Sequence, residues 1–467
     1  MHTRFPPQLF AFVVTLLITL LLYGRALAGY FIFDDFVWLE CAAQSLNDPL
    51  HIFNLHISGF FRPLSHLVFG LLHAAGGDSP ALFHGAAWVL HGLCAALMAH
   101  LVLRLYGDRW LAVFAALLFA LNPLYEEVML WVSAINEPVS SAMVLLTLIA
   151  WLRYLTVARR ATLGYALALL GFLLALAAKE SAVSTVVLMG LLHLSLRLRN
   201  QLRTRRSAGR WLLVYLPFVV LLGAYLTGQL LMQRQNLLVT RGEYAVGVHA
   251  LPRLARNLWH LLRFTWPPLA AAALCALCLP RAPASRAGGG FAPRALLQGW
   301  SRLDRRQILL LLAAVAALML PYCMFRWALM ASRYFYGPAL VWALAAALCL
   351  RLCATRPGVA CRVLALLALL GLVVHALSVS GKRTDLYLKT SNEVRTFVRA
   401  AAGVPAAPTP QPLVDGVLSG QHLDAALRLY HPSHSIVFRA VKPGEIKALR
   451  GPLWRWDRRL QRLQRIR

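Results

Sequence analysis

The chain has 467 residues, of which 59% are hydrophobic and only 14% are charged. Because an ordinary soluble domain carries about 25% charged residues, these proportions exclude a water-soluble enzyme. The formal net charge of +29 would suggest a nucleic-acid partner, but the arginines lie mostly in short segments between apolar runs and no nucleic-acid-binding module is recognisable, so we expect no nucleic-acid partner.

Long apolar runs recur along most of the chain and predict an all-α polytopic membrane protein. A spanning helix needs roughly 20 mainly apolar residues. The first run could be a signal peptide ending in Ala26-Leu27-Ala28, but its length and the many runs that follow favour an uncleaved helix. Eleven spans are predicted, near residues 8–28, 81–105, 110–127, 135–156, 162–178, 181–197, 210–232, 256–280, 307–328, 334–353 and 360–380.

Basic and acidic residues separate onto opposite sides of these spans. Arg-rich short loops alternate with loops that hold nearly all of the acidic residues before residue 380. By the positive-inside rule the Arg-rich loops face the cytoplasm, which places the acidic loops on the outer, periplasmic side. Since acidic residues contribute little to topology, their gathering indicates a shared site. Five of these acidic residues can also be explained as solvated loop charges, and we expect this to hold for most of them. They are Glu40, Asp48, Asp78, Glu137 and Glu243.

Two segments outside the spans are long enough to hold structure of their own. Residues 29–80 form a long first outer loop, and its segment 60–72 has the i, i+3, i+4 pattern of a helix along the membrane surface. After residue 380 the long apolar runs stop, which predicts a Pro-rich linker and a small outer domain or a solvated tail. We therefore expect a transmembrane domain over 1–380 and a small extramembrane region over 381–467.

A pair of carboxylates follows the first span within an aromatic segment. Asp34 and Asp35 lie in the sequence Tyr-Phe-Ile-Phe-Asp-Asp-Phe-Val-Trp over 30–38. At a membrane interface such a pair resists double ionisation, which is how a general base is tuned. Alternatively, the pair holds a divalent cation such as Mg²⁺ or Mn²⁺, or it caps the next helix. The sequence demands no cofactor.

A second acidic pair and a Lys-Glu pair occur on the same predicted outer side. Glu126 and Glu127 close the third span, and two acidic pairs on one side are more specific than either alone. Lys179 and Glu180 lie in the tight turn between spans five and six, where ionisable groups are costly enough to indicate a role. An ion pair within the helix hairpin is the alternative for these last two residues.

Arginines beside a helix start supply candidate phosphate ligands. Arg62 precedes Pro63 at the start of the predicted surface helix, and Arg333 begins span ten together with Tyr334 and Tyr336. A guanidinium can fork onto a phosphate, and a helix N-terminus favours anions. Snorkelling to lipid headgroups, and an aromatic belt at span ten, are the competing interpretations.

The order of these motifs resembles that of the membrane glycosyltransferases of the GT-C fold, in particular the protein O-mannosyltransferase and TMTC-type branches that use a polyprenyl-phosphate sugar. The resemblance covers roughly residues 30–340 in sparse short motifs. In chain order these are Asp34-Asp35, Phe61-Arg62-Pro63-Leu64, Phe83-His84, Leu90-His91, Leu118 to Leu121 with Pro123, Glu127 with Trp131-Val132-Ser133, Lys179-Glu180, and Arg333-Tyr334 with Tyr336 and Pro338.

The chain departs from the family pattern at three points. Where the TMTC-like pattern has His-Pro-x-His-x-Glu, residues 122–127 read Asn-Pro-Leu-Tyr-Glu-Glu, and Ala87 replaces an Asn expected between His84 and His91. The tail shows no tetratricopeptide repeats. The choice of acceptor is therefore not carried over from relatives that have such repeats.

The resemblance implies an inverting sugar transferase with its site on the periplasmic face of a bacterial inner membrane. It would move a sugar from a polyprenyl-phosphate donor, with undecaprenyl phosphate as the expected lipid, to a hydroxyl on a protein, lipid or glycan. The residues expected to act are Asp34 or Asp35 as the base, Glu127 for acceptor or metal contact, Arg62, Lys179 and Arg333 for the phosphate, and Glu126, Glu180, Tyr334 and Tyr336 as further substrate contacts.

Two other function classes use the same features. In a carrier or flippase for lipid-linked sugars, intramembrane charges line a pathway for the lipid phosphate. The clustering of charges on one side, and the lack of an inverted repeat in the sequence, favour the transferase over the carrier. A non-catalytic assembly protein is the third class.

Overall fold

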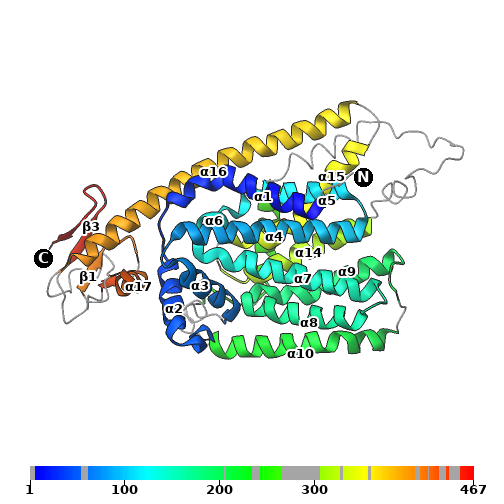
Figure 1. Cartoon of the computed structure of the whole chain (residues 1–467), viewed down its shortest axis with the longest axis horizontal. Coiled ribbons are helices and arrows are strands. Elements are labelled where there is room, and N and C mark those ends of the chain that lie inside the picture. Colours follow the sequence, from blue (N-terminus) through cyan, green and yellow to red (C-terminus); the bar gives the residue numbers. More distant parts are fainter. Residues whose placement is uncertain are drawn as a thin grey trace, which may run out of the picture.

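Figure 1 shows a computed structural model of the whole chain. It describes residues 6–53, 61–203, 207–233, 242–245, 247–263, 305–326, 330–355, 359–404, 411–418, 420–430, 438–440 and 453–466.

Most described residues lie in helices, which pack side by side in one bundle (Figure 1). Short 3-10 turns join several of them, and a further helix covers 250–263. The labelled helices are α1 (Pro7–Tyr23), α2 (Asp35–Asn47), α3 (Pro63–Gly76), α4 (Pro80–Tyr106), α5 (Arg109–Ala120), α6 (Glu126–Leu130), α7 (Asn136–Thr156), α8 (Ala161–Ala178), α9 (Thr185–Leu198), α10 (Ala208–Gln233), α14 (Arg305–Cys323), α15 (Tyr336–Thr355), α16 (Val359–Ala402) and α17 (Gly420–Tyr430).

The predicted all-α polytopic class is confirmed. Within the described residues, eight helical segments are long and apolar enough to span a membrane, and a ninth results if the bent pair Arg109–Ala120 and Pro123–Leu130 is one span. The predicted number of eleven is not confirmed. The span expected over 307–328 is a shorter apolar helix, Leu309–Cys323, and the span expected over 256–280 lies largely outside the described residues.

Local sequence signals explain where two neighbouring helices end and begin. Gly107 ends α4 with a φ of 66°, a left-handed conformation that glycine adopts without steric cost. The Asp108 carboxylate then accepts the backbone N–H groups of Trp110 and Leu111 and so caps α5.

The two ends of the bundle hold different polar groups. At one end, Arg351 Nε donates to Asp108 Oδ2 at 2.9 Å, and Arg199 donates to the carbonyl of Leu105 at 3.1 Å and to Gln307 at 2.9 Å. Loops that the sequence assigns to the Arg-rich side therefore meet at one end. The opposite end carries α2 and α3 (Figure 1).

The first outer loop folds into α2 and α3, and the helix expected over 60–72 is present as α3. Aromatic side chains hold α3 and the segment before α2 against α4. The rings of Phe31 and Phe69 contact that of Phe83 on α4, with centroids 5.7 and 5.0 Å away, and all three side chains are fully buried.

The 44-residue helix α16 links the bundle to a small C-terminal unit (Figure 1). At 1.5 Å per residue it is about 66 Å long. It runs through residue 380, so the proposed division of the chain there falls inside one continuous helix. Beyond it lie α17 and a four-stranded sheet in the order β2-β1-β3-β4, in which only the β3–β4 pair is antiparallel. The strands are β1 (Gln411–Val414), β2 (Phe438–Ala440), β3 (Trp454–Asp457) and β4 (Arg462–Arg465).

Candidate active site

Asp35 joins the first outer loop to the segment after α6. Its side chain is fully buried, and its two oxygens accept the backbone N–H groups of Ile32 at 2.9 Å and Ser133 at 2.7 Å. Burial raises the pKa of Asp35 to about 7, because removal from water disfavours the charged form. Both carboxylate oxygens of Asp35 therefore already have hydrogen-bond donors from the backbone.

Asp34 points to a different environment. Its side chain is 49% exposed, and its Oδ1 lies 2.8 Å from Nε2 of His422 on α17. The residue before it, Phe33, has a φ of 46°, a conformation that few non-glycine residues adopt and that often marks functional sites. The two neighbouring carboxylates thus have separate partners, and Asp34 is the one that a substrate can reach.

Glu127 and Arg333 form an ion pair at the rim of the same end. Arg333 Nη1 donates to Glu127 Oε2 at 2.9 Å, and the backbone N–H of Arg333 donates to the same oxygen at 3.3 Å. The guanidinium lies over the rings of Trp131 and Tyr334, 4.6 and 4.7 Å from their centroids. These contacts fix a partly exposed cation in one orientation.

Three motifs far apart in the sequence converge here. Phe33 contacts Trp131 edge-to-face at a centroid distance of 6.3 Å, and Arg333 covers that same Trp131. Asp35 binds Ser133, two residues further along. The Asp34-Asp35 segment, the segment after Glu127 and the start of α15 therefore share one region.

The other member of the second acidic pair faces α16. Glu126 is buried, and its Oε1 lies 3.2 Å from Arg383 Nε. Glu126 consequently ties α6 to the long helix, whereas Glu127 faces Arg333.

Arg62 and Glu180 form a two-pronged ion pair. Arg62 Nε and Nη2 donate to the two carboxylate oxygens at 2.8 and 2.7 Å, and the side chains are 11% and 24% exposed. Next to it, Ser65 Oγ donates to the carbonyl of Ala178 at 2.8 Å. The start of α3 is thereby fixed to the turn after α8.

Lys179 is buried beside Arg62 and pairs with Glu137, not with its neighbour Glu180. Tyr322 OH donates to Glu137 Oε2 at 3.5 Å, and the Lys179 ammonium lies 5.0 Å from the ring centroid of Tyr334. The expectation that Glu137 is a solvated loop charge is wrong, because its side chain is only 4% exposed. Burial of Lys179 lowers its pKa, since an apolar environment disfavours the ammonium form.

Tyr336 lies apart from these ion pairs. It is fully buried, and its hydroxyl lies 2.9 Å from Nδ1 of His91. His84 likewise meets the hydroxyl of Tyr387 on α16 at 2.9 Å. Both histidines join helices in the interior, and Tyr336 is not brought to the surface where Arg333 lies.

Sequence reasoning did not identify three of the residues that structure this site. Tyr322 and His422 belong to no recognised motif, and only their long-range packing brings them here. Asn136, whose Oδ1 accepts from Lys179 Nζ at 3.4 Å, could have been noticed next to Glu137 as one of the polar residues at the start of a span.

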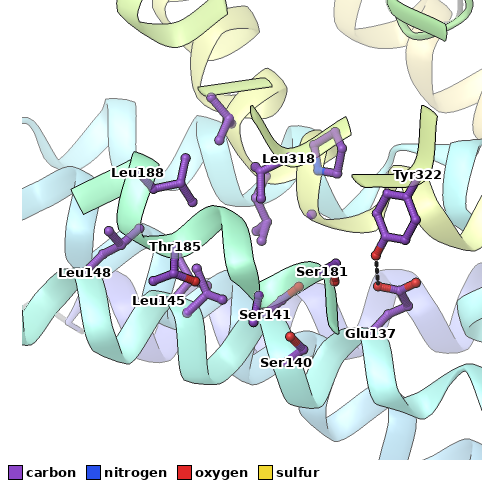
Figure 2. A pocket seen from close by; sticks show the side chains of 16 residues that line it. Glu137, Ser140, Ser141, Leu145, Leu148, Ser181, Thr185, Leu188, Leu318 and Tyr322 are labelled. Carbon is purple, nitrogen blue, oxygen red and sulfur yellow. Dashed lines mark hydrogen bonds between the residues drawn. The ribbon is translucent and has the colours of Figure 1, made fainter. Parts of the chain in front are cut away.

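A groove between helices begins at Glu137 and Tyr322 (Figure 2). Its cavity has a volume of about 60 Å³ and is partly open to the outside. Figure 2 shows Glu137 and Tyr322 joined at one end, with Ser181 close by, and Leu148 and Leu188 at the other. The groove is thus polar where it meets the ion pairs and mostly apolar along its length, where Ser140, Ser141 and Thr185 add hydroxyl groups.

The carboxylates do not fit a metal centre. In the part of the chain that the structure describes, no three His, Cys, Asp or Glu side chains come together as metal ligands. Both Asp35 oxygens accept backbone N–H groups, and Asp34 faces His422. The contacts of Asp34 and Asp35 therefore give no support to the Mg²⁺ or Mn²⁺ alternative.

Comparison with known proteins adds independent information. No family model matches the chain. The protein O-mannosyl-transferase TMTC2 of Mus musculus is 27% identical over 147 residues, which are 29% of this chain and 18% of that protein. The match therefore spans less than a fifth of the length of this curated relative.

Solved structures match over nearly the whole chain. ArnT from Cupriavidus metallidurans bound to undecaprenyl phosphate has a TM-score of 0.53 at 12% identity, covering 96% of this chain and 92% of ArnT. The oligosaccharyltransferase AglB from Archaeoglobus fulgidus, in complex with an inhibitory peptide and a dolichol-phosphate, has a TM-score of 0.51 at 13% identity, covering 90% of this chain and 63% of AglB. The chain has the GT-C fold.

The GT-C fold confirms the expected fold class, and its coverage extends beyond the predicted 30–340 into the C-terminal unit. At 12% and 13% identity these likenesses show the fold alone.

Proposed function

We propose that this chain is a membrane glycosyltransferase, which moves a sugar from a polyprenyl-phosphate donor to a hydroxyl acceptor by one inverting displacement. The observation that carries the proposal is the convergence of an accessible carboxylate, Asp34, with a set of buried or fixed cations beside a mostly apolar groove. The GT-C fold of the undecaprenyl-phosphate-bound ArnT and of the dolichol-phosphate complex of AglB supports the same class.

Each cation near the site is held by a carboxylate. Among the described residues these pairs are Arg62–Glu180, Lys179–Glu137, Arg333–Glu127 and Arg383–Glu126. The formal charges cancel, so none of these cations is left without a counter-charge before a donor arrives. A donor phosphate would share or exchange these partners, and an Arg fork matches phosphate geometry as well as it matches a carboxylate.

Lipid and sugar have distinct places in this arrangement. The polyprenyl chain would lie in the groove of Figure 2, whose polar end adjoins Lys179 and Glu137. The phosphate would lie toward Arg62, Lys179 and Arg333, and the sugar toward Asp34. Delivery of the donor within the bilayer fixes the reacting atoms relative to the protein.

The proposed displacement needs one base and one stabilised leaving group. Asp34 accepts the proton of the acceptor hydroxyl while that oxygen forms a bond to the anomeric carbon. The bond from this carbon to the phosphate oxygen breaks, and its electron pair leaves with the polyprenyl phosphate. The leaving phosphate gains one negative charge, which the neighbouring cations stabilise.

The proposed location rests on the charge pattern of the sequence. The Arg-rich loops predict that the end carrying Asp34 faces the periplasm of a bacterial inner membrane, and undecaprenyl phosphate is the lipid proposed there. The acceptor is a hydroxyl on a protein, lipid or glycan.

Transfer by the purified protein from a polyprenyl-phosphate sugar tests the proposal. We expect Asp34→Asn to lower kcat by at least about 100-fold, since a general base contributes about 10²–10⁴-fold. Asp385→Asn is the matched control, because Asp385 pairs with Arg25 on an exposed surface and should retain full activity. Unchanged transfer by folded Asp34→Asn would refute the role of this carboxylate. Movement of the donor across vesicles without cleavage of its sugar–phosphate bond would identify a carrier instead.

A further inference from the structure

The C-terminal unit reaches Asp34 through α17. His422 Nε2 lies 2.8 Å from Asp34 Oδ1, and Arg428 Nη2 donates to Glu40 Oε2 at 3.0 Å. Both contacts join α17 to α2, the helix that begins at Asp35. Tyr430 extends this interface against the ring of Phe36, 6.3 Å away between centroids.

The C-terminal unit is fixed in place by α16. Trp456 of β3 packs edge-to-face on Phe397 at 5.1 Å between centroids, and its Nε1 donates to Glu393 Oε1 at 3.3 Å. Arg395 of the same helix donates to the carbonyl of Gly29 at 3.4 Å, and its guanidinium lies 5.0 Å from the ring centroid of Tyr30. The end of α16 thus holds both the sheet and the segment that leads to Asp34.

This framework places an imidazole on one oxygen of an accessible carboxylate. The His422 side chain is 22% exposed and that of Asp34 is 49% exposed, so the contact lies at the edge of the site. A hydrogen bond from a ring N–H to Oδ1 restricts rotation of the carboxylate and leaves Oδ2 directed elsewhere. In metal sites, mutation of a residue that orients a metal ligand through a hydrogen bond typically lowers affinity or activity about 10–100-fold.

We infer that His422 is a positioning residue for Asp34, so that the C-terminal unit completes the active site. The inference rests on the proposed function. His422 donates Nε2–H to Asp34 Oδ1 and presents Oδ2 to the acceptor hydroxyl. The acceptor proton moves to Oδ2, the acceptor oxygen bonds to the anomeric carbon, and the polyprenyl phosphate leaves with the electron pair of the broken bond. His422 itself touches neither substrate.

The test compares His422→Leu, His422→Gln and Arg428→Met in the full-length protein with a polyprenyl-phosphate sugar. His422→Leu removes the donor, whereas the side-chain amide of His422→Gln can place an N–H near the position of Nε2. Arg428→Met loosens the same interface away from Asp34. We expect His422→Leu to lower kcat by about 10–100-fold with the donor KM changed less than about twofold, and His422→Gln to stay within about threefold of wild type, as does Arg428→Met.

Specific results overturn the inference. Wild-type or higher activity in His422→Leu would show that His422 does not orient the base. Equal losses in all three variants would show that docking of the C-terminal unit matters and that the hydrogen bond does not. Size-exclusion profiles and unfolding midpoints close to wild type establish that the variants are folded.

Asp34→Asn, assayed alongside, separates this inference from the proposed function. If Asp34→Asn is inactive while His422→Leu transfers sugar as fast as wild type, the inference alone fails. If Asp34→Asn transfers as well as wild type, the proposed base is wrong and the inference falls with it.

Discussion

The buried Lys179–Glu137 pair makes the sharpest prediction about stability. The two side chains are 1% and 4% exposed. Lys179→Met keeps most of the side-chain volume but leaves the Glu137 carboxylate buried without its cation. Removing one partner of a buried pair costs about 3–5 kcal/mol, a large part of the 5–15 kcal/mol that typically holds a fold.

Removing both charges should reverse much of that loss. In Lys179→Met/Glu137→Gln no charge is left buried, and replacement of whole buried pairs is often neutral in stability. We therefore expect the double variant to recover at least half of the loss seen in Lys179→Met. Half of the Lys179→Met loss is about 1.5–2.5 kcal/mol. Any cost of Glu137→Gln alone adds to it, so the coupling free energy between the two positions is at least about 1.5 kcal/mol.

Denaturant titration of the purified proteins in detergent micelles measures these differences in unfolding free energy. Lys389→Met is the matched control, because Lys389 is exposed on α16 and its loss should change the free energy of unfolding by less than about 0.5 kcal/mol. A single variant within 1 kcal/mol of wild type, or a double variant whose loss equals the sum of the two single losses, would refute the assignment of a coupled buried pair.

Three further predictions concern Asp35, the α7–α8 contact and Arg333. Burial raises the pKa of Asp35 to about 7 from 3.8, so its contribution to stability is fully present below pH 3.8 and is lost as the pH rises through 7. Between pH 5 and 8, wild type should therefore lose about 2–3 kcal/mol more unfolding free energy than uncharged Asp35→Asn, and parallel curves would contradict this. Gly171→Ala should destabilise the protein by about 1–3 kcal/mol, because a Cβ there would lie 2.7 Å from Thr147 Oγ1. Gly190→Ala is the control and should be neutral or stabilising, because a Cβ at Gly190 would have no atom within 4 Å. Equal unfolding midpoints of the two variants would exclude the close contact at Gly171. Arg333→Lys should lower kcat/KM for the donor about tenfold, because an ammonium loses the fork and the stacking of the guanidinium, and unchanged donor kinetics would argue against a phosphate contact.

The sequence predicted the bundle and its polarised ends because both depend on local composition. Apolar runs of membrane length predict helices wherever they occur, and the Arg-rich loops report on their own sides. The contact between Arg351 and Asp108 joins loops that this reasoning had already placed together. The number of spans was less predictable. The apolar run over 307–328 is as long as a span in the sequence, whereas the apolar helix in the structure is the shorter Leu309–Cys323.

Pairing of charges was beyond the sequence because neighbours in the chain diverge in space. Lys179 has an extended backbone at the end of α8, with φ −162° and ψ 144°, and a 3-10 turn begins at Glu180. The two side chains consequently reach different helices: Lys179 contacts Glu137 on α7 and Glu180 contacts Arg62. Asp34 and Asp35 separate in the same way, and their motif alone did not say which carboxylate is accessible.

The length of α16 sets the height and angle of the C-terminal unit over the bundle. Arg383 is tied to Glu126 near the bundle, and Glu393 is tied to Trp456 of the sheet. One residue inserted between these two anchors would turn the sheet by about 100° and lift it by about 1.5 Å, which would carry α17 away from α2. The ten-residue spacing between Arg383 and Glu393 therefore determines where α17 lies, and with it the position of His422, 39 residues after Arg383.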